Sequence, residues 1–301
     1  MRRPCRRIRR FPFSDGLTML SYRHAFHAGN HADILKHFVL WLVLDYFGRK
    51  DKPYWYIDTH SGAGLYDLGG SEAQKVGEYR HGAARLFAAA EQGALPEELA
   101  RFAGRLKTIL PRPGLYCGSP WLAQAETRES DKLRLFELHP ADFLLLDNNM
   151  REAGLKRRGI LKREDGFKGL LALLPPPTRR AVVLTDPPYE EKQDYARVVQ
   201  TLKDAKKRFA QGCYLVWYPC LSREESRRLP EQLKKLSPDK YLLAELHVAA
   251  PRADGFGMHG SGMFAINPPY LLREQLARNL PALANLLAQD AGACFVLDGA
   301  G

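Results

Sequence analysis

The stretch Val182-Val183-Leu184-Thr185-Asp186-Pro187-Pro188-Tyr189 predicts a buried strand that ends at an acidic turn. Its first residues are apolar and mostly β-branched, as in strands that are buried on both faces of a parallel sheet. Two prolines follow the acid, and they can neither extend a strand ladder nor enter a helix comfortably. We therefore expect Asp186 at the carboxyl end of a strand, the edge where open α/β sheets bind ligands.

The atoms of this turn can hold an amine and a base. The Asp186 carboxylate and the Pro187 carbonyl are acceptors on a stiff backbone, so together they can accept both hydrogens of an exocyclic NH2 group. Tyr189 offers a flat ring on which a base can stack, a contact worth roughly 1 to 3 kcal/mol. The sequence Asp-Pro-Pro-Tyr resembles the catalytic motif of amino-methyltransferases, which move a methyl group from S-adenosylmethionine (SAM) to adenine or cytosine. An ordinary strand-to-loop turn is the alternative, so the motif needs its sheet context.

The composition is that of a globular protein with a basic surface. The chain has 301 residues, 45% of them hydrophobic and 26% charged, which suffices for one large domain or one domain with an insertion. Its formal net charge of +11 favours polyanionic partners. Residues 1–18 contain six arginines and one aspartate, which leaves +6 for the rest of the chain. We interpret residues 1–18 as a disordered basic extension or as a start-site artefact upstream of Met19.

Membrane insertion, a metal centre and disulfide bonds are not predicted. The longest apolar run of the first predicted helix, residues 38–44, is far shorter than the ~20 residues that span a bilayer. No secretory signal precedes it, so we expect a cytoplasmic protein. His24, His27 and His31 lack carboxylate or cysteine company at metal-ligand spacing. The five cysteines are too dispersed for a zinc site or a disulfide framework and are expected to be free thiols: Cys5, Cys117, Cys213, Cys220 and Cys294.

Seven strands are expected, with helices between most of them. The patterns that predict them lie at residues 54–57, 133–136, 159–163, 182–183, 213–218, 242–248 and 263–267. This alternation is typical of a mostly parallel, doubly wound α/β sheet. An amphipathic helix is expected from the N-cap Asn30 to about Gly48. The helical pattern of residues 66–117 is longer than a crossover needs, which predicts a small helical subdomain inserted after the first strand and its helix.

Three further turns are expected at the same edge as Asp186. The first strand ends in DTHSGAG, residues 58–64, which looks like the SAM-binding loop of class I methyltransferases, where a glycine such as Gly62 lets backbone amides approach a ligand. Glu137 follows the second strand and can accept both ribose hydroxyls of SAM. Asp165 and Gly166 follow the third strand, and Asp165 can accept from the adenine amine. A single loop acid is normally just solvated, but their common edge and order favour one cofactor site.

A second proline turn, Asn267-Pro268-Pro269-Tyr270, also fits the wider amino-methyltransferase pattern. It follows the seventh strand, which is antiparallel in sheets of the methyltransferase type, so its end should lie opposite the cofactor. We therefore interpret it as a structural loop.

The segment SYRHAFHAGNHADILKH, residues 21–37, precedes and opens the first helix. Aromatic and basic residues interleave between Tyr22 and His27, which suits contact with RNA. A surface loop that packs Tyr22 and Phe26 on the core explains the same pattern.

Together these motifs resemble the RlmJ family, bacterial enzymes that methylate the exocyclic amine of one adenine in 23S ribosomal RNA. The matching stretches are SYRHAFHAGNHADILKH, DTHSGAG, GSP at 118–120, FELHP at 136–140, EDGF at 164–167 and DPPYE at 186–190. The resemblance covers essentially residues 19–301. It implies one Rossmann-like class I methyltransferase domain with a helical insertion, SAM as cofactor, 23S rRNA as partner and no metal. We also expect a monomer.

The resemblance implies roles for single residues as well. Asp186 would be the catalytic residue and proton acceptor, alongside Pro187 and Tyr189 of the same turn. Tyr22 and His24 would contact the RNA substrate. With Gly62 of the loop described above, the residues expected to bind SAM are Lys36, His37, His60, Gly62, Ser119, Glu137, Asp165, Gly166 and Asp186.

Two other functions fit parts of the pattern. A DNA adenine methyltransferase would share the edge motifs, but such enzymes usually carry a separate target-recognition domain, and little chain follows the seventh strand. A non-catalytic RNA-binding factor of ribosome assembly would retain a degenerate pocket, whereas Asp186 and Glu137 are intact here.

Overall fold

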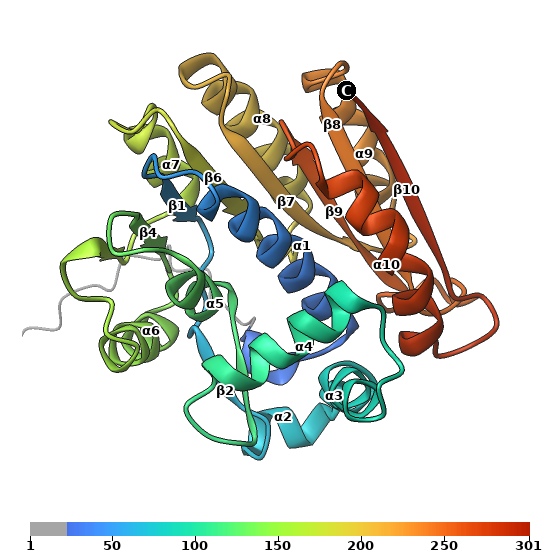
Figure 1. The fold of residues 1–301 in the computed structure, drawn as a ribbon. Helices are drawn as coiled ribbons and strands as arrows, with labels where there is room; N and C mark the ends of the chain where they lie inside the picture. Colours follow the sequence, from blue (N-terminus) through green and yellow to red (C-terminus); the bar gives the residue numbers. More distant parts are fainter. Residues whose placement is uncertain (1–22) are drawn as a thin grey trace, which may run out of the picture.

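An eight-stranded sheet organises residues 23–301, the part of the chain that the computed structural model describes (Figure 1). The strand order is β10-β8-β9-β7-β6-β1-β4-β5. The five strands from β5 to β7 are parallel, whereas β9 runs antiparallel to both of its neighbours. The strands are β1 Trp55–Asp58, β4 Lys132–Phe136, β5 Gly159–Lys162, β6 Ala181–Thr185, β7 Cys213–Cys220, β8 Tyr241–His247, β9 Gly260–Ile266 and β10 Cys294–Ala300.

The prediction of a mostly parallel, doubly wound α/β sheet is confirmed, but the count of seven strands is wrong by one. Each predicted strand is present, and β10 is the additional one, paired antiparallel with β8 at the edge of the sheet. Its Phe295 and Val296 are exposed, and Asp298 and Gly299 interrupt its apolar run. An edge strand of this kind lacks the continuous apolar pattern that marks a central strand.

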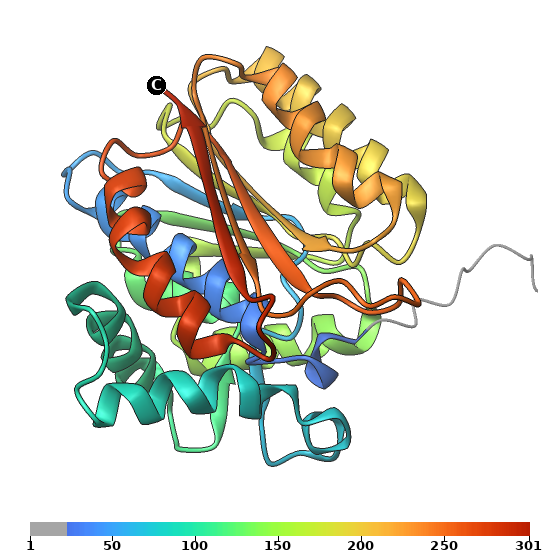
Figure 2. The ribbon, with the colours of Figure 1, turned by 90° about the vertical axis from the view of Figure 1, so that its right-hand side faces the viewer.

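Helices cover both faces of the sheet. On one face lie α1 His31–Gly48, α5 Ser119–Glu126, α6 Pro140–Glu152 and α10 Leu272–Leu287; on the other lie α7 Gly166–Leu173, α8 Lys192–Arg208 and α9 Glu224–Leu236 (Figure 2). Each face has its own large hydrophobic cluster. Among residues 23–301, no helix is both long and apolar enough to cross a lipid bilayer.

Helix α1 begins where the sequence predicts, but it is not amphipathic. The side chain of Asn30 accepts hydrogen bonds from the backbone amides of Ala32 and Asp33, as an N-cap does. All side chains from His31 to Leu44 are buried, because α10 and the helices of the segment after β1 cover the face that points away from the sheet. The polar residues in this helix are therefore buried groups that need partners.

The segment between β1 and β4 is helical, as predicted. Strands β2 Leu65–Asp67 and β3 Leu115–Cys117 pair antiparallel, and between them lie α2 Ser71–Val76, α3 Ala83–Glu91 and α4 Glu97–Ile109. Phe102 of α4 packs on Phe38 of α1, with ring centroids 5.4 Å apart. The core of the segment is thus continuous with that of the sheet domain, and a separate subdomain over residues 66–117 stays a prediction.

The turn after β9 lies at the edge opposite that of Asp186. Because β9 is antiparallel to β7, Asn267 follows it at the amino ends of the parallel strands. Its side-chain amide donates to the carbonyls of Ala210 and Gly212, which lie just before β7. The expected position of Asn267-Pro268-Pro269-Tyr270 is confirmed, and its purely structural role stays a prediction.

Candidate active site

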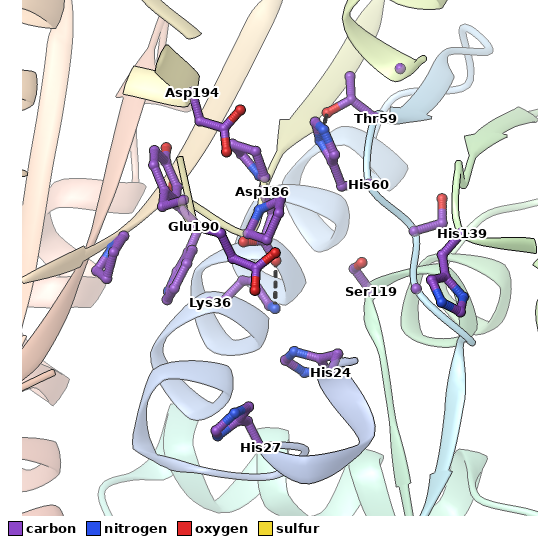
Figure 3. A pocket seen from close by; sticks show the side chains of 18 of the residues that line it. His24, His27, Lys36, Thr59, His60, Ser119, His139, Asp186, Glu190 and Asp194 are labelled. Carbon is purple, nitrogen blue, oxygen red and sulfur yellow. Dashed lines mark hydrogen bonds and ion pairs between the residues drawn. The ribbon is translucent and has the colours of Figure 1, made fainter. Parts of the chain in front are cut away.

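The turns after β1, β4 and β6 are held together by backbone hydrogen bonds. Thr59 N donates to the carbonyl of Leu184 (3.1 Å), and Ser61 N donates to that of Phe136 (2.8 Å). Strands β4 and β5 lie on one side of β1, whereas β6 and β7 lie on its other side. The strand order therefore reverses between β1 and β6, which is the topological switch point of the sheet. A cavity of about 560 Å³ opens at this point (Figure 3).

The glycine turn and Glu137 form one wall of the cavity. The amides of Gly62 and His139 donate to separate oxygens of the Glu137 carboxylate, at 2.8 and 2.7 Å. Gly62 has φ +60°, and a Cβ there would overlap the hydroxyl group of Tyr66, so only glycine fits. Burial raises the pKa of Glu137 to about 7.

The buried carboxyl group of Asp58 supports this wall on the side that faces away from the cavity. Asp58, at the end of β1, accepts hydrogen bonds from the hydroxyls of Tyr56 and Ser119, both at 2.7 Å, and from the amide of His60 at 3.3 Å. Burial raises the pKa of Asp58 to about 6. Ser119 lines the cavity at the first turn of α5, so Asp58 fixes the direction of its hydroxyl.

The start of α7 forms a second wall. Asp165 caps this helix with one oxygen and accepts from Arg197 of α8 with the other, at 2.7 Å. A Cβ at Gly166 would overlap the carbonyl oxygen of Thr59, so glycine is required for the two turns to meet. The ring of His60 packs edge-on against Phe167 at 4.8 Å, and burial lowers the pKa of His60 to about 3, which keeps the imidazole neutral.

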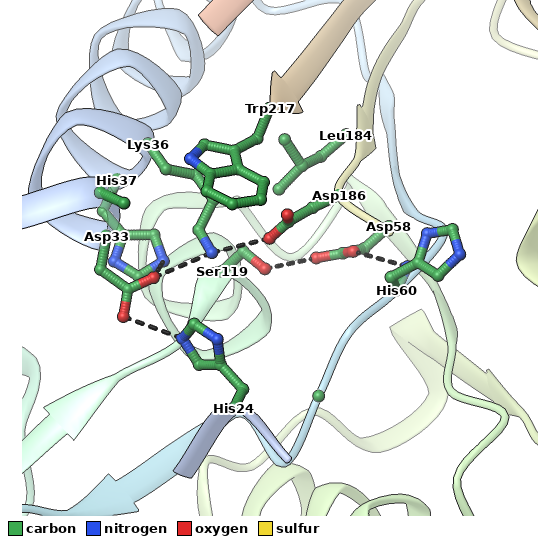
Figure 4. Close-up of polar contacts among 12 residues, drawn as sticks. His24, Asp33, Lys36, His37, Asp58, His60, Ser119, Leu184, Asp186 and Trp217 are labelled. Atoms are coloured by element: carbon green, nitrogen blue, oxygen red, sulfur yellow. Dashed lines mark hydrogen bonds and ion pairs between the residues drawn. The ribbon is translucent and has the colours of Figure 1, made fainter. Parts of the chain in front are cut away.

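Asp186 forms a buried ion pair with helix α1 (Figure 4). The ammonium of Lys36 lies 2.7 Å from Oδ2 of Asp186 and 2.9 Å from Oδ1 of Asp33, and 5.7 Å from the ring centre of Trp217. Burial disfavours the charged ammonium, but the two carboxylates outweigh it and hold the pKa of Lys36 well above its ordinary value. The lysine is therefore a fixed cation in the cavity wall.

His24 pairs with Asp33, the other carboxylate that contacts Lys36. Its Nε2 lies 2.9 Å from Oδ2 of Asp33, which also accepts from the amide of Gly29 at 2.8 Å. Burial works against the charge of Asp33, yet His24 and Lys36 hold its pKa well below the usual range. His24 lines the cavity, and its contact with an RNA substrate stays a prediction.

Comparison with known proteins decides the family. The family model "Ribosomal RNA large subunit methyltransferase D, RlmJ" matches residues 51–297. The "Ribosomal RNA large subunit methyltransferase J" of Haemophilus influenzae is 42% identical over 275 residues, which make up 90% of this chain and 95% of that protein. The Escherichia coli protein of the same name is 44% identical over 271 residues, 89% of this chain and 94% of its own. The chain belongs to the RlmJ family.

A solved structure agrees with this assignment. The crystal structure of protein LPL1258 from Legionella pneumophila superposes with a TM-score of 0.82 and 31% sequence identity, over 91% of this chain and 99% of that one. The family predicted from the sequence motifs is confirmed, and with it the α/β fold of class I methyltransferases.

Not every residue expected from RlmJ motifs faces the cavity. Of the expected SAM-binding residues, all except His37 line it. His37 is fully buried behind the wall, where Nδ1 is 2.9 Å from the hydroxyl of Tyr116 and burial lowers its pKa to about 3. The hydrogen bond uses only Nδ1 and leaves Nε2 without a partner, so the contact of His37 with the cofactor stays a prediction. Tyr22 lies outside the described residues.

The ring of Tyr189 also differs from the prediction. Tyr189 is 2% exposed, its hydroxyl donates to the carbonyl of Trp217 at 2.8 Å, and its ring lies 4.6 Å from that of Tyr195. Its φ of +53° turns the side chain into the core beneath α8, so the ring offers no open face to a base. The less buried Trp217 brings aromatic surface to the cavity instead.

Sequence reasoning missed several residues of the site. Asp33 lies one helical turn before Lys36, and this i,i+3 spacing is a recognisable ion-pair pattern. Asp58 was seen only as part of its loop motif. For Arg197 and Trp217 no local pattern exists, because they come from α8 and β7 and reach the cavity only through the tertiary fold.

Proposed function

We propose that this chain transfers the methyl group of SAM to the N6 amine of one adenine in 23S ribosomal RNA. Its relatives are named as methyltransferases of the large ribosomal subunit RNA. The single observation that carries the proposal is that the Asp186-Pro187 turn, the glycine turn after β1 and Glu137 line one cavity. An amine held at the first of these would therefore lie next to a donor held at the other two.

The acceptors in the cavity wall suit SAM. Each oxygen of Glu137 already accepts one backbone N–H, which leaves lone pairs for two vicinal hydroxyls of a ribose. Asp165 caps α7 and pairs with Arg197, and its remaining lone pairs can accept from an adenine amine. When bound, SAM supplies an electrophilic methyl group.

Asp186 and Pro187 are suited to orient an adenine amine. Lys36 occupies Oδ2 of Asp186, so Oδ1 is the oxygen that can accept one amine hydrogen while the carbonyl of Pro187 accepts the other. Two such hydrogen bonds favour a pyramidal nitrogen, whose lone pair then points away from the ring conjugation. The ion pair with Lys36 holds the carboxylate in place, and positioning of this kind supplies much of the rate.

Proton removal follows methyl transfer. A carboxylate whose ordinary pKa is near 4 cannot deprotonate a neutral adenine amine, but the methylated amine is cationic and strongly acidic. Asp186 can accept its proton after transfer. Because the amine lies on the pairing edge of the base, the adenine must be unstacked or flipped to reach the cavity.

The test is methyl transfer with purified protein, labelled SAM and 23S rRNA transcribed in vitro, followed by nucleoside analysis for N6-methyladenosine. Asp186→Ala should lower turnover roughly 10²–10⁴-fold. Asn267→Ala, in the similar proline turn at the opposite edge, should leave turnover largely intact. Labelling of DNA alone would favour a DNA methyltransferase, and SAM-independent binding to rRNA without labelling would favour a non-catalytic assembly factor.

A further inference from the structure

Cys220, Glu245 and His247 come together outside the catalytic cavity. One ligand atom of each, the thiol sulfur, a carboxylate oxygen and an imidazole nitrogen, lies within 4.8 Å of the other two. They line a separate cavity of about 380 Å³ on the face of the sheet that α9 covers. Nothing in the proposed methyl transfer uses them.

Two glycines in β9, the strand between β7 and β8, bring these side chains together. Gly260 of β9 pairs with Cys220 of β7 on one side and with His247 of β8 on the other. Two residues along β9, Gly262 pairs with Glu245 in the same way. Paired residues on neighbouring strands point to the same face of the sheet. Since the glycines of β9 have no side chains, the side chains of β7 and β8 can approach each other above β9. A Cβ at Gly260 would lie 3.0 Å from Nδ1 of His247 and 2.5 Å from a backbone carbonyl oxygen.

The donor set and its spacing fit Zn²⁺. Thiolate, imidazole and carboxylate are the ligands that zinc takes in proteins, whereas Mg²⁺ and Ca²⁺ prefer oxygen alone. Nε2 of His247 and Oε2 of Glu245 are 3.0 Å apart. Zinc bonds of about 2.0 to 2.1 Å at tetrahedral angles separate two ligand atoms by roughly 3.3 Å, so these two atoms need to move little. The sulfur of Cys220, within 4.8 Å of both, would move closer to complete the site. The hydroxyl of Tyr218 donates to the other oxygen of Glu245 at 2.6 Å, which orients the carboxylate.

We propose that Cys220, Glu245 and His247 form a zinc site that ties β7 to β8 across β9. Binding displaces the thiol proton of Cys220, which passes to solvent, while His247 binds as the neutral imidazole through the lone pair of Nε2. Three protein ligands would leave a fourth coordination position for a solvent molecule. The site lies next to the active centre along the chain, because Pro219 and Leu221 on either side of Cys220 line the catalytic cavity. Zinc would therefore hold the end of β7 where it borders the methyl-transfer site.

The spacing of these residues along the chain does not reveal a metal site. Cys220 is separated from His247 by a helix and most of a strand, and the two residues become neighbours only through the antiparallel pairing of β9. Zinc motifs recognised from sequence have ligands a few residues apart.

The test uses the full-length protein after removal of metal with a chelator. Titration with Zn²⁺ against a chromophoric chelator should give one equivalent bound, and Zn²⁺ should raise the melting temperature. Replacement of Zn²⁺ by Co²⁺ should give the charge-transfer absorption of a thiolate ligand. Cys220→Ser should abolish that absorption and weaken Zn²⁺ binding by roughly 100-fold or more.

The controls separate a ligand from a merely structural thiol. Cys213→Ser changes a buried cysteine at the other end of β7 and should keep both the metal and its absorption. His247→Gln, at a less buried position, should weaken Zn²⁺ binding even if Cys220→Ser lowers the stability of the metal-free protein. Absence of Zn²⁺ binding at micromolar concentration, or equal affinity in the wild type and Cys220→Ser, would overturn the proposal.

Discussion

SAM should bind about tenfold more weakly at pH 6 than at pH 8, because the proposed ribose contact needs Glu137 without its proton. Burial raises the pKa of this carboxyl group to about 7. At pH 8 about nine tenths of the molecules carry the carboxylate, and at pH 6 only about one in eleven does. Since the apparent dissociation constant scales inversely with the competent fraction, the ratio is about ten, or about 1.4 kcal/mol.

The measurement is isothermal titration of SAM into the protein at pH 6, 7 and 8. The amino group of SAM titrates near the upper end of this range, so the raw pH dependence contains a contribution from the ligand. Glu137→Gln keeps that contribution and removes the carboxyl group, and its two backbone donors, Gly62 and His139, remain in place. The ratio of wild-type to variant affinity therefore isolates Glu137.

Two results would refute a contact between SAM and the ionised Glu137. If the wild type and Glu137→Gln show the same pH dependence, the carboxylate does not contact the ligand in its ionised form. Tighter wild-type binding at pH 6 than at pH 8 would mean that the protonated acid is the binding form, and the proposed contact with two hydroxyls would be wrong.

Three substitutions and one control probe the framework of the site by urea unfolding. Lys36→Met should cost roughly 3 to 5 kcal/mol at pH 7 and lower turnover, because it leaves two carboxylates, that of Asp186 among them, without their buried cation. Gly166→Ala should cost about 1 to 3 kcal/mol through overlap with a backbone carbonyl, whereas Gly104→Ala, in open space within α4, should stabilise by about 0.5 to 1 kcal/mol. Asn30→Ala should cost about 1 kcal/mol through loss of the α1 cap.

The outline of the site follows from the sequence because parallel strands end at one edge. Once the runs before Asp58, Glu137, Asp165 and Asp186 are predicted as parallel strands, their acids must meet, whatever the packing around them. Local chemistry also predicts Asn30 as the cap of α1. Such inferences need only neighbours along the chain and the period of the pattern.

The remainder depends on contacts between distant segments. Helix α1 was expected to be amphipathic, and the hydrophobic pattern alone does not reveal that α4 and α10 cover its outer face. The inward turn of Tyr189 depends on a positive φ and on a carbonyl of β7, neither of which the motif specifies. The pairing of Lys36 with Asp186 joins residues 150 positions apart.

The buried ion pairs of Lys36 are better explained by the charge of the cavity than by the stability of the fold. A buried group of one lysine and two carboxylates stabilises the fold little more than three apolar side chains of similar volume would, since desolvation offsets most of the attraction. Acidic side chains outnumber lysine and arginine in the lining of the cavity, and Glu137 adds to their charge as it ionises. If SAM is the donor, its sulfonium enters a negative cavity of low dielectric, where the attraction is stronger than in water. Methyl transfer leaves a neutral thioether, so the attraction between these charges and the sulfonium is absent once the methyl group has been transferred.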